Sequence, residues 1–168
     1  MSETQQSPRA SEFMTADVKR VTEEMSLTDV VQFLLKHQVS TAPVVEMQNG
    51  KPMLLGFISE GDCLSALTNE LFFGNPSPAQ TARTVMTSHP ICVAPETELF
   101  SLVSVFTSHH LRHLPVVENG VLLGLVSRRD ILKAMELYYK RQVHDQDRER
   151  LLKDTSQSLN LRFMIDRG

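Results

Sequence analysis

Two short stretches of this 168-residue chain place a hydroxyl and a carboxylate at the same spacing. Ser59 precedes Asp62 by three residues, and Ser127 precedes Asp130 by three. Each pair follows a glycine and two apolar residues, where a predicted strand runs into a predicted helix. A serine at a helix start lies beside free backbone N–H groups, where the helix dipole favours an anion such as a phosphate. An ionised aspartate one turn later only accepts hydrogen bonds, so it can take both hydroxyls of a ribose diol.

The same S-x-x-D pattern has a second interpretation as a capping box. In that arrangement Asp130 accepts a hydrogen bond from the backbone N–H of Ser127 and serves the helix alone. The pattern by itself leaves both roles open. Its occurrence twice, each time after a glycine and an apolar strand, favours a ligand role for at least one copy.

An internal repeat organises the chain. Met14-Thr15 and Pro43-Val44-Val45 recur 72 residues later as Met86-Thr87 and Pro115-Val116-Val117, whereas the two Gly-to-Asp stretches are 68 residues apart. The difference puts four extra residues of the first copy within residues 47–52. A repeat of this length indicates two supersecondary units, each of which needs the other to cover its apolar face.

Hydrophobic spacing and turn residues predict the same order of elements in both copies. For the first copy they predict a helix beginning at Ser26, strands over 42–46 and 53–58 around an Asn49-Gly50 turn, and a helix from Ser59. For the second copy they predict strands over 91–93, 114–118 and 121–126, a helix over 99–109, an Asn119-Gly120 turn and a long helix after Asp130. Asn-Gly between apolar runs is a strong hairpin signal, because both residues tolerate positive φ.

Composition shifts divide the chain into five predicted segments. These are a disordered start (1–12), the first repeat (13–70), a linker with glycine and two prolines (71–83), the second repeat (84–139) and a polar helical or frayed tail (140–168). For the tail, an appended docking segment and a fraying end both remain open.

The charge balance and the cysteines exclude several classes of protein. With 17 Lys+Arg against 20 Asp+Glu the net charge is −3, so nucleic acid is not expected as a partner. Cys63 and Cys92 lie far apart in apolar patterns, which suggests neither a disulfide framework nor a metal pair. The polar N-terminus lacks the apolar core of a signal peptide, and no run approaches the roughly 18 apolar residues of a membrane span. We therefore expect a cytoplasmic chain with no membrane association.

Each copy has Pro-Val-Val before its hairpin and G-h-h-S-x-x-D at its strand-to-helix junction, where h is a hydrophobic residue and x any residue. This duplicated order of elements resembles the CBS domain pair, or Bateman module. The resemblance covers about residues 13–139. It implies an α/β fold of tandem β-α-β-β-α repeats related by a pseudo-two-fold axis, here with a C-terminal helical extension. It also implies clefts between the repeats that bind AMP, ADP, ATP or S-adenosylmethionine as regulatory ligands, with no cofactor required.

The family's pocket positions can be carried over onto this sequence. The first site implied by the resemblance, around Asp130, comprises Thr15, Val18, Val39, Ser40, Thr41, Arg112, Leu125, Ser127, Arg129 and Asp130. The second, around Asp62, comprises Thr87, Ile91, Leu111, His113, Phe57, Ser59 and Asp62, with Ser40, Gly61 and Arg112 also contributing.

The two sites differ in nearby charge. Arg112, Arg128 and Arg129 lie close in sequence to the helix start at Asp130, whereas the other copy has Glu60 and Gly61 there. Guanidinium groups match phosphate oxygens in charge and geometry, so we expect the Asp130 site to bind a phosphorylated ligand more tightly and the Asp62 site to be weaker or empty. The alternative for Arg128 and Arg129 is a solvated first turn.

Other constellations carry less weight. His109, His110 and His113 form a cluster, but no carboxylate or cysteine joins them in sequence, so no metal site is expected. Neither Ser59 nor Ser127 has a base placed by the pattern, so no catalytic residue and no enzyme activity are expected. The prediction is a regulatory sensor that forms a homodimer and acts on an unknown effector protein. A dimerising scaffold with vestigial pockets is the alternative, and a small nucleotide enzyme is a third class.

Overall fold

The computed structural model describes residues 7–74, 79–144 and 147. Its labelled elements follow one another as α1 (Ala10–Phe13), β1 (Val21–Thr22), α2 (Leu27–His37), β2 (Thr41–Gln48), β3 (Lys51–Ser59), α3 (Glu60–Phe73), α4 (Ala82–Val85), β4 (Thr87–Ser88), α5 (Leu99–His109), β5 (His113–Glu118) and β6 (Val121–Ser127). A further helix begins at Arg128 and continues through residue 144. The predicted α/β fold with a C-terminal helical extension is confirmed.

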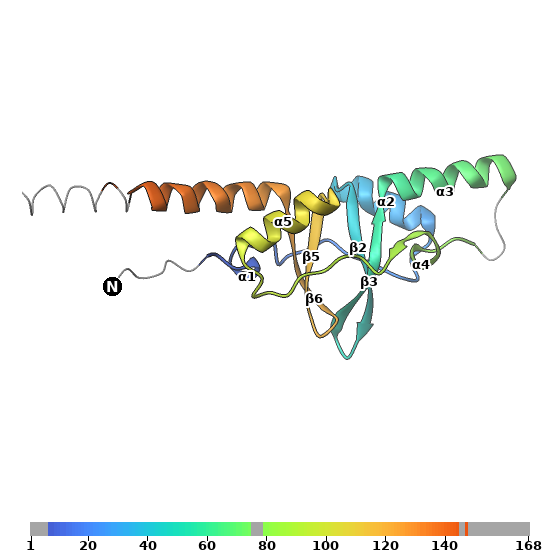
Figure 1. Cartoon of the computed structure of the whole chain (residues 1–168). Coiled ribbons are helices and arrows are strands. Elements are labelled where there is room, and N and C mark those ends of the chain that lie inside the picture. Colours follow the sequence, from blue (N-terminus) through green and yellow to red (C-terminus); the bar gives the residue numbers. More distant parts are fainter. Residues whose placement is uncertain (1–6, 75–78, 145–146, 148–168) are drawn as a thin grey trace, which may run out of the picture.

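A single mixed sheet joins the two repeats. Its strands are ordered β1-β2-β3-β6-β5, with β4 paired to β3. The strands β3 and β6 of the two repeats meet antiparallel at Met53 and Val121. In Figure 1, α2, α3, α5 and the terminal helix lie along the top of the view, and the tips of the two hairpins lie at the bottom. The sheet therefore connects two structurally equivalent halves.

Both hairpins turn on Asn-Gly, as the sequence predicts. Asn49 and Gly50 have φ of 50° and 77°, and Asn119 and Gly120 have 51° and 81°. Positive φ at both central residues is typical of the turn that matches the twist of antiparallel strands. β2 and β3 span 8 and 9 residues against 6 and 7 for β5 and β6, so the four extra residues of the first copy lengthen its hairpin.

The first segment of each repeat packs against the other repeat. Near the N-terminus, the backbone N–H of Ala10 donates to the carbonyl of Thr97 over 2.9 Å. The equivalent segment of the second repeat turns back, and the N–H of Ala82 donates to the carbonyl of Met25 over 2.8 Å. Both alanines are completely buried. Exchange of these starts locks the repeats together, because neither core is complete without the other's first segment.

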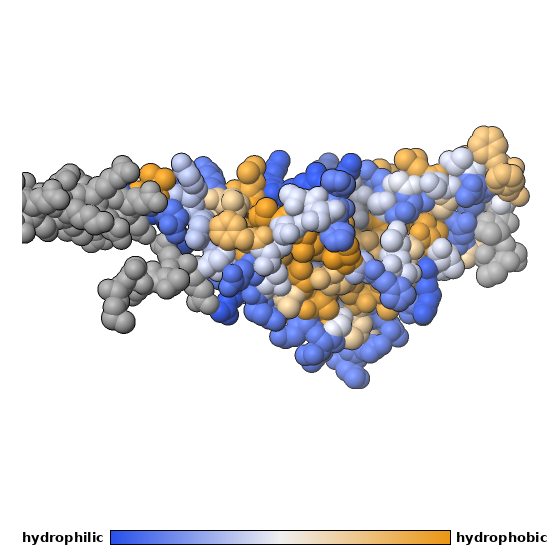
Figure 2. All heavy atoms as spheres, viewed as in Figure 1, coloured by the Kyte–Doolittle hydropathy of each residue, from blue (hydrophilic) through white to orange (hydrophobic). Residues whose placement is uncertain are grey.

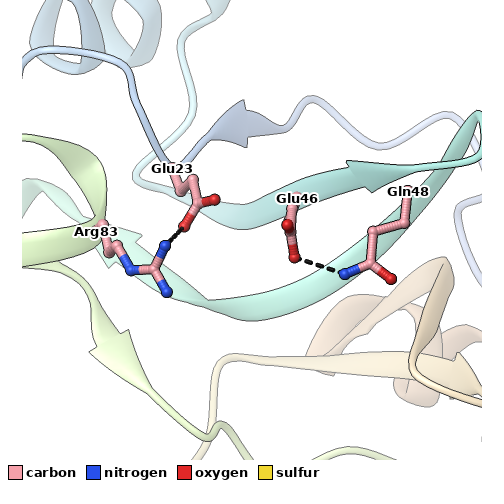
Figure 3. Close-up of polar contacts among 4 residues, drawn as sticks. All are labelled: Glu23, Glu46, Gln48 and Arg83. Atoms are coloured by element: carbon pink, nitrogen blue, oxygen red, sulfur yellow. Dashed lines mark hydrogen bonds and ion pairs between the residues drawn. The ribbon is translucent and has the colours of Figure 1, made fainter.

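The buried side chains form a core in each half. One core, around Val44 and Ile58, also receives Ala82 from the second repeat; the other, around Val116 and Val126, receives Ala10 from the first. An ion pair between Glu23 and Arg83 reinforces one of the two exchanged starts, as Figure 3 shows.

Three sequence expectations need correction. The predicted strand over 91–93 is absent as a strand: Val93 forms only an isolated parallel bridge with Val116. The disordered start predicted for 1–12 does not hold for residues 7–12, since the chain is helical from Ala10. The predicted linker over 71–83 is shorter among the described residues, because α3 continues to Phe73 and α4 begins at Ala82. Most of the tail, 145–146 and 148–168, lies outside the described residues.

Candidate ligand-binding clefts

The two Ser/Asp pairs form capping boxes with closely similar geometry. Oδ2 of Asp62 accepts from the backbone N–H of Ser59 over 2.8 Å and from its hydroxyl over 2.6 Å. Oδ2 of Asp130 accepts from the corresponding groups of Ser127 over 2.9 and 2.6 Å. Within the described part of the chain, Oδ1 of neither aspartate has a hydrogen-bond partner. The capping interpretation is therefore correct, and one oxygen of each half-buried carboxylate is still available to a ligand.

Two glycines let the repeats approach each other beside these caps. A Cβ built on Gly56 would lie 2.5 Å from the carbonyl oxygen of Thr87, and one on Gly124 would lie 2.8 Å from that of Thr15. Thr15 exchanges two backbone hydrogen bonds with Leu125, of 2.8 and 3.0 Å, and Thr87 pairs with Phe57. The glycine of each G-h-h-S-x-x-D stretch is thus where the first segment of the other repeat crosses, and this crossing forms one wall of each cleft.

The cleft at Asp62 has a volume of about 560 Å³. Its walls come from both repeats: Ser40, Thr41, Phe57, Ser59, Asp62, Thr87, His89, Pro90, Ile91, Leu111, Arg112, His113 and Pro115. All seven residues predicted for the second site line this cleft, and so do Ser40 and Arg112, whereas Gly61 does not. Thr41, His89, Pro90 and Pro115 were not predicted.

The cleft at Asp130 is smaller, about 400 Å³. Its lining residues are Thr15, Asp17, Val18, Lys19, Gln38, Val39, Ser40, Thr41, His113, Leu125, Ser127 and Asp130. Eight of the ten predicted residues are present, and Arg112 and Arg129 are not. Asp17, Lys19, Gln38 and His113 were missed, although Asp17 and Lys19 flank the predicted Val18 and occupy the positions of His89 and Ile91 in the repeat. Whether these residues bind a ligand stays a prediction.

The arginines expected at the Asp130 site lie elsewhere. Arg128 donates to the backbone carbonyls of Leu111 and His110, over 2.5 and 3.0 Å, where α5 ends. Its positive charge therefore stabilises the C-terminal end of a helix. Arg112 lines the Asp62 cleft, and Arg129 lines neither. The reason for expecting tighter phosphate binding at Asp130 is thereby removed.

His113 lies between the two clefts, and Ser40 and Thr41 also line both. Burial lowers the pKa of the His113 imidazole below its ordinary value of 6.5; Asp130 opposes this shift and Arg112 adds to it. The neutral imidazole is therefore favoured at neutral pH. An anionic ligand in either cleft would favour its protonated form.

Other chemical groups do not join the clefts. In residues 7–74, 79–144 and 147 no three His, Cys, Asp or Glu side chains are grouped as metal ligands. Burial raises the pKa of the Cys63 and Cys92 thiols, which disfavours the reactive thiolate. Over the same residues, no helix is both long and apolar enough to cross a membrane.

Comparison with known proteins identifies the repeat. The family model of the CBS domain matches residues 10–69 and 82–137. An uncharacterized 17.7 kDa protein of Acidianus ambivalens is 27% identical over 128 residues, which cover 76% of this chain and 73% of the relative. The mitochondrial CBS domain-containing protein CBSX3 of Arabidopsis thaliana is 28% identical over 116 residues, and the match spans 68% of this chain but 54% of the relative.

The fold agrees with that of solved CBS proteins. The crystal structure of CBSX2 of Arabidopsis thaliana in complex with AMP superposes with a TM-score of 0.65 and 25% identity, over 78% of this chain and 98% of the other. The duplicated hairpins, the exchanged starts and the two family matches lead to one conclusion: the chain belongs to the CBS domain family and contains two CBS repeats.

Proposed function

We propose that the chain is a regulatory module that binds an adenosine-containing ligand in the clefts between its two CBS repeats. The observation that carries the proposal is the pair of half-buried carboxylates, Asp62 and Asp130, each fixed at a capped helix start with Oδ1 facing no protein donor in the described residues. A ribose diol offers the donors that these oxygens lack. The AMP complex of the related CBSX2 supports the choice of ligand class.

Ligand binding would regulate by shifting the population of domain arrangements. Each cleft has walls from both repeats, so a ligand that fits one relative orientation better than another stabilises that orientation. Because each repeat begins on the other, a small rotation between the halves would be transmitted to both exchanged segments. The unknown effector would bind one relative orientation of the repeats in preference to the other.

A homodimer is part of the proposal. Exposed apolar side chains recur at equivalent positions of α3 and the terminal helix, with Leu64 matching Leu132 and Leu71 matching Tyr139. Apolar atoms also gather at the far end of α3, the right-hand end of the view in Figure 2. An exposed apolar patch such as the one at the end of α3 is typical of interaction sites. The setting we propose is cytoplasmic.

Thermal unfolding with AMP, ATP, S-adenosylmethionine and NADH tests the ligand class. A ligand at 100 times its Kd stabilises the native state by about 2.7 kcal/mol, which raises the melting temperature measurably. We expect AMP to give a larger shift than 2′-deoxy-AMP, because only AMP presents the complete diol. Equal shifts would contradict the role given to the aspartates.

The alternative is a scaffold whose clefts are vestigial. Its support is that the capping boxes already give Asp62 and Asp130 a structural role. A scaffold would dimerise yet show no shift with any nucleotide. Product analysis after incubation with ATP would detect the third class, a nucleotide enzyme.

A further inference from the structure

The charged side chains that line the two clefts differ in their net charge. The Asp62 cleft has one carboxylate, Asp62, with the guanidinium of Arg112 and the imidazoles of His89 and His113. The Asp130 cleft has two carboxylates, Asp17 and Asp130, with one ammonium, that of Lys19, and the shared His113. Leaving the imidazoles aside, the lining groups sum to no net charge at Asp62 and to one negative charge at Asp130.

The cations in the two clefts are also unequally available. Nζ of Lys19 lies 3.6 Å from Oδ2 of Asp17, so this cation is already paired with a carboxylate. Arg112 has neither an ion pair nor a side-chain hydrogen bond to the described residues, and its side chain is exposed at the cleft. A free guanidinium can take two phosphate oxygens at once in a fixed geometry, whereas the Lys19 ammonium is a single point charge that the carboxylate of Asp17 partly offsets.

Charged residues in the first turns of α3 and of the terminal helix do not make the Asp130 cleft the more positive of the two. Arg128 is held by two carbonyls at the end of α5, and Arg129 does not line the Asp130 cleft. Glu60, at the start of α3, does not line the Asp62 cleft, and its backbone N–H donates to the carbonyl of Ser40. Charges outside a cleft in water contribute much less than those that contact the ligand.

We propose that the Asp62 cleft selects phosphorylated ribonucleosides through Arg112, and that the Asp130 cleft discriminates little between a phosphorylated and an unphosphorylated ribonucleoside. The proposal rests on the proposed function and reverses the order expected from the sequence. It gives the two clefts different selectivity for the phosphate, so an unphosphorylated ribonucleoside would compete with a phosphorylated one mainly at the Asp130 cleft.

Calorimetric titration with AMP and with adenosine tests the assignment. Asp130→Ala leaves the Asp62 cleft as the only complete site, and Asp62→Ala leaves the Asp130 cleft. We expect the ratio of AMP affinity to adenosine affinity to be about tenfold higher in Asp130→Ala than in Asp62→Ala. Equal ratios, or a higher ratio in Asp62→Ala, would overturn the assignment.

A second set of variants leaves both capping boxes intact. Arg112 is exposed, so Arg112→Gln is expected to fold normally and to lower the AMP-to-adenosine ratio about tenfold at the site that prefers AMP in the wild type. Lys51→Gln removes the same charge at the tip of the β2–β3 hairpin, outside both clefts, and is expected to leave the ratio unchanged.

Two results would separate the possible failures. If Arg129→Gln lowers the ratio and Arg112→Gln does not, the cleft assignment is wrong while nucleotide binding stands. If wild-type protein binds neither AMP nor adenosine, the proposed function is wrong, and the assignment fails with it.

Discussion

The two repeats agree closely in backbone geometry and differ in the side chains around it. The caps at Ser59 and Ser127 have matching hydrogen bonds, of 2.8 and 2.9 Å to the backbone and 2.6 Å in both to the hydroxyl. The charges that line the adjacent clefts do not match. Duplication has thus kept the backbone that forms a cleft, while the selectivity of each cleft depends on residues that the repeats do not share.

The largest effect is expected where the two repeats cross. In Gly56→Ala the new Cβ would meet the Thr87 carbonyl oxygen at 2.5 Å and the Met86 sulfur at 2.8 Å. The backbone oxygen cannot move aside without disturbing β4, so we expect a loss of about 2 kcal/mol or more in the free energy of unfolding. Urea denaturation measures the loss. Gly124→Ala should behave similarly, because the Thr15 carbonyl oxygen would lie at 2.8 Å.

Gly61→Ala is the matched control for these substitutions. Gly61 lies in α3, and a Cβ added there would have Oγ of Ser59 as its nearest neighbour, at 3.6 Å, an ordinary contact. Alanine is favoured over glycine in a helix by up to about 1 kcal/mol, so the protein should be unchanged or slightly more stable. A Gly61→Ala variant less stable than Gly56→Ala would contradict the crossing geometry.

A smaller effect is expected from Arg128, which has no equivalent in the first repeat because Glu60 occupies that position. Arg128→Gln removes charge-assisted hydrogen bonds to the carbonyls of His110 and Leu111 at the end of α5. We expect a loss of about 1 kcal/mol in the free energy of unfolding. Arg129→Gln, its exposed neighbour, should change stability by less than about 0.5 kcal/mol. Equal losses would show that Arg128 does not hold α5.

The smallest effect is a pH dependence that comes from His113. Because its pKa is lowered in the folded state, the unfolded chain takes up the proton first as pH falls through 6.5. The stabilising contribution is therefore complete above that pH and decreases below it. When the pH is lowered from 7.5 to 5.5, the free energy of unfolding measured by urea denaturation should decrease more in wild type than in His113→Gln. AMP should reduce the difference, since a bound phosphate favours the imidazolium; an identical pH profile for both proteins would exclude the effect.

The sequence predicted the backbone features well because they depend on local residue types. Asn-Gly turns, the S-x-x-D caps and the G-h-h-S-x-x-D junctions carry their geometry in a few adjacent residues. The repeat spacing of 72 residues also aligns Ala10 with Ala82, and each of these alanines is buried in a core. This alignment was the signal in the sequence that the ordered part of the first repeat begins before residue 13.

Charge placement was harder to predict, because it depends on where a long side chain points. Arg128 and Arg129 are adjacent to Asp130 in sequence, yet one bonds to the end of α5 and the other lies outside the cleft. Arg112 and Lys19 line different clefts, which only the crossing of the two repeats determines. The expectation that the Asp130 site binds a phosphorylated ligand more tightly than the Asp62 site was inferred from adjacency in sequence, and the structure removes the reason for it.

Calorimetric titration of AMP into wild type and into the double variant Asp62→Ala/Asp130→Ala tests the central claim most directly. Circular dichroism and the melting temperature would first establish that the double variant is folded, since loss of the carboxylate half of each capping box costs about 1 kcal/mol. We predict that wild type binds AMP and that the folded double variant loses at least about tenfold in affinity, because both ribose acceptors are gone. Unchanged AMP affinity in the folded double variant would contradict the role of the two aspartates.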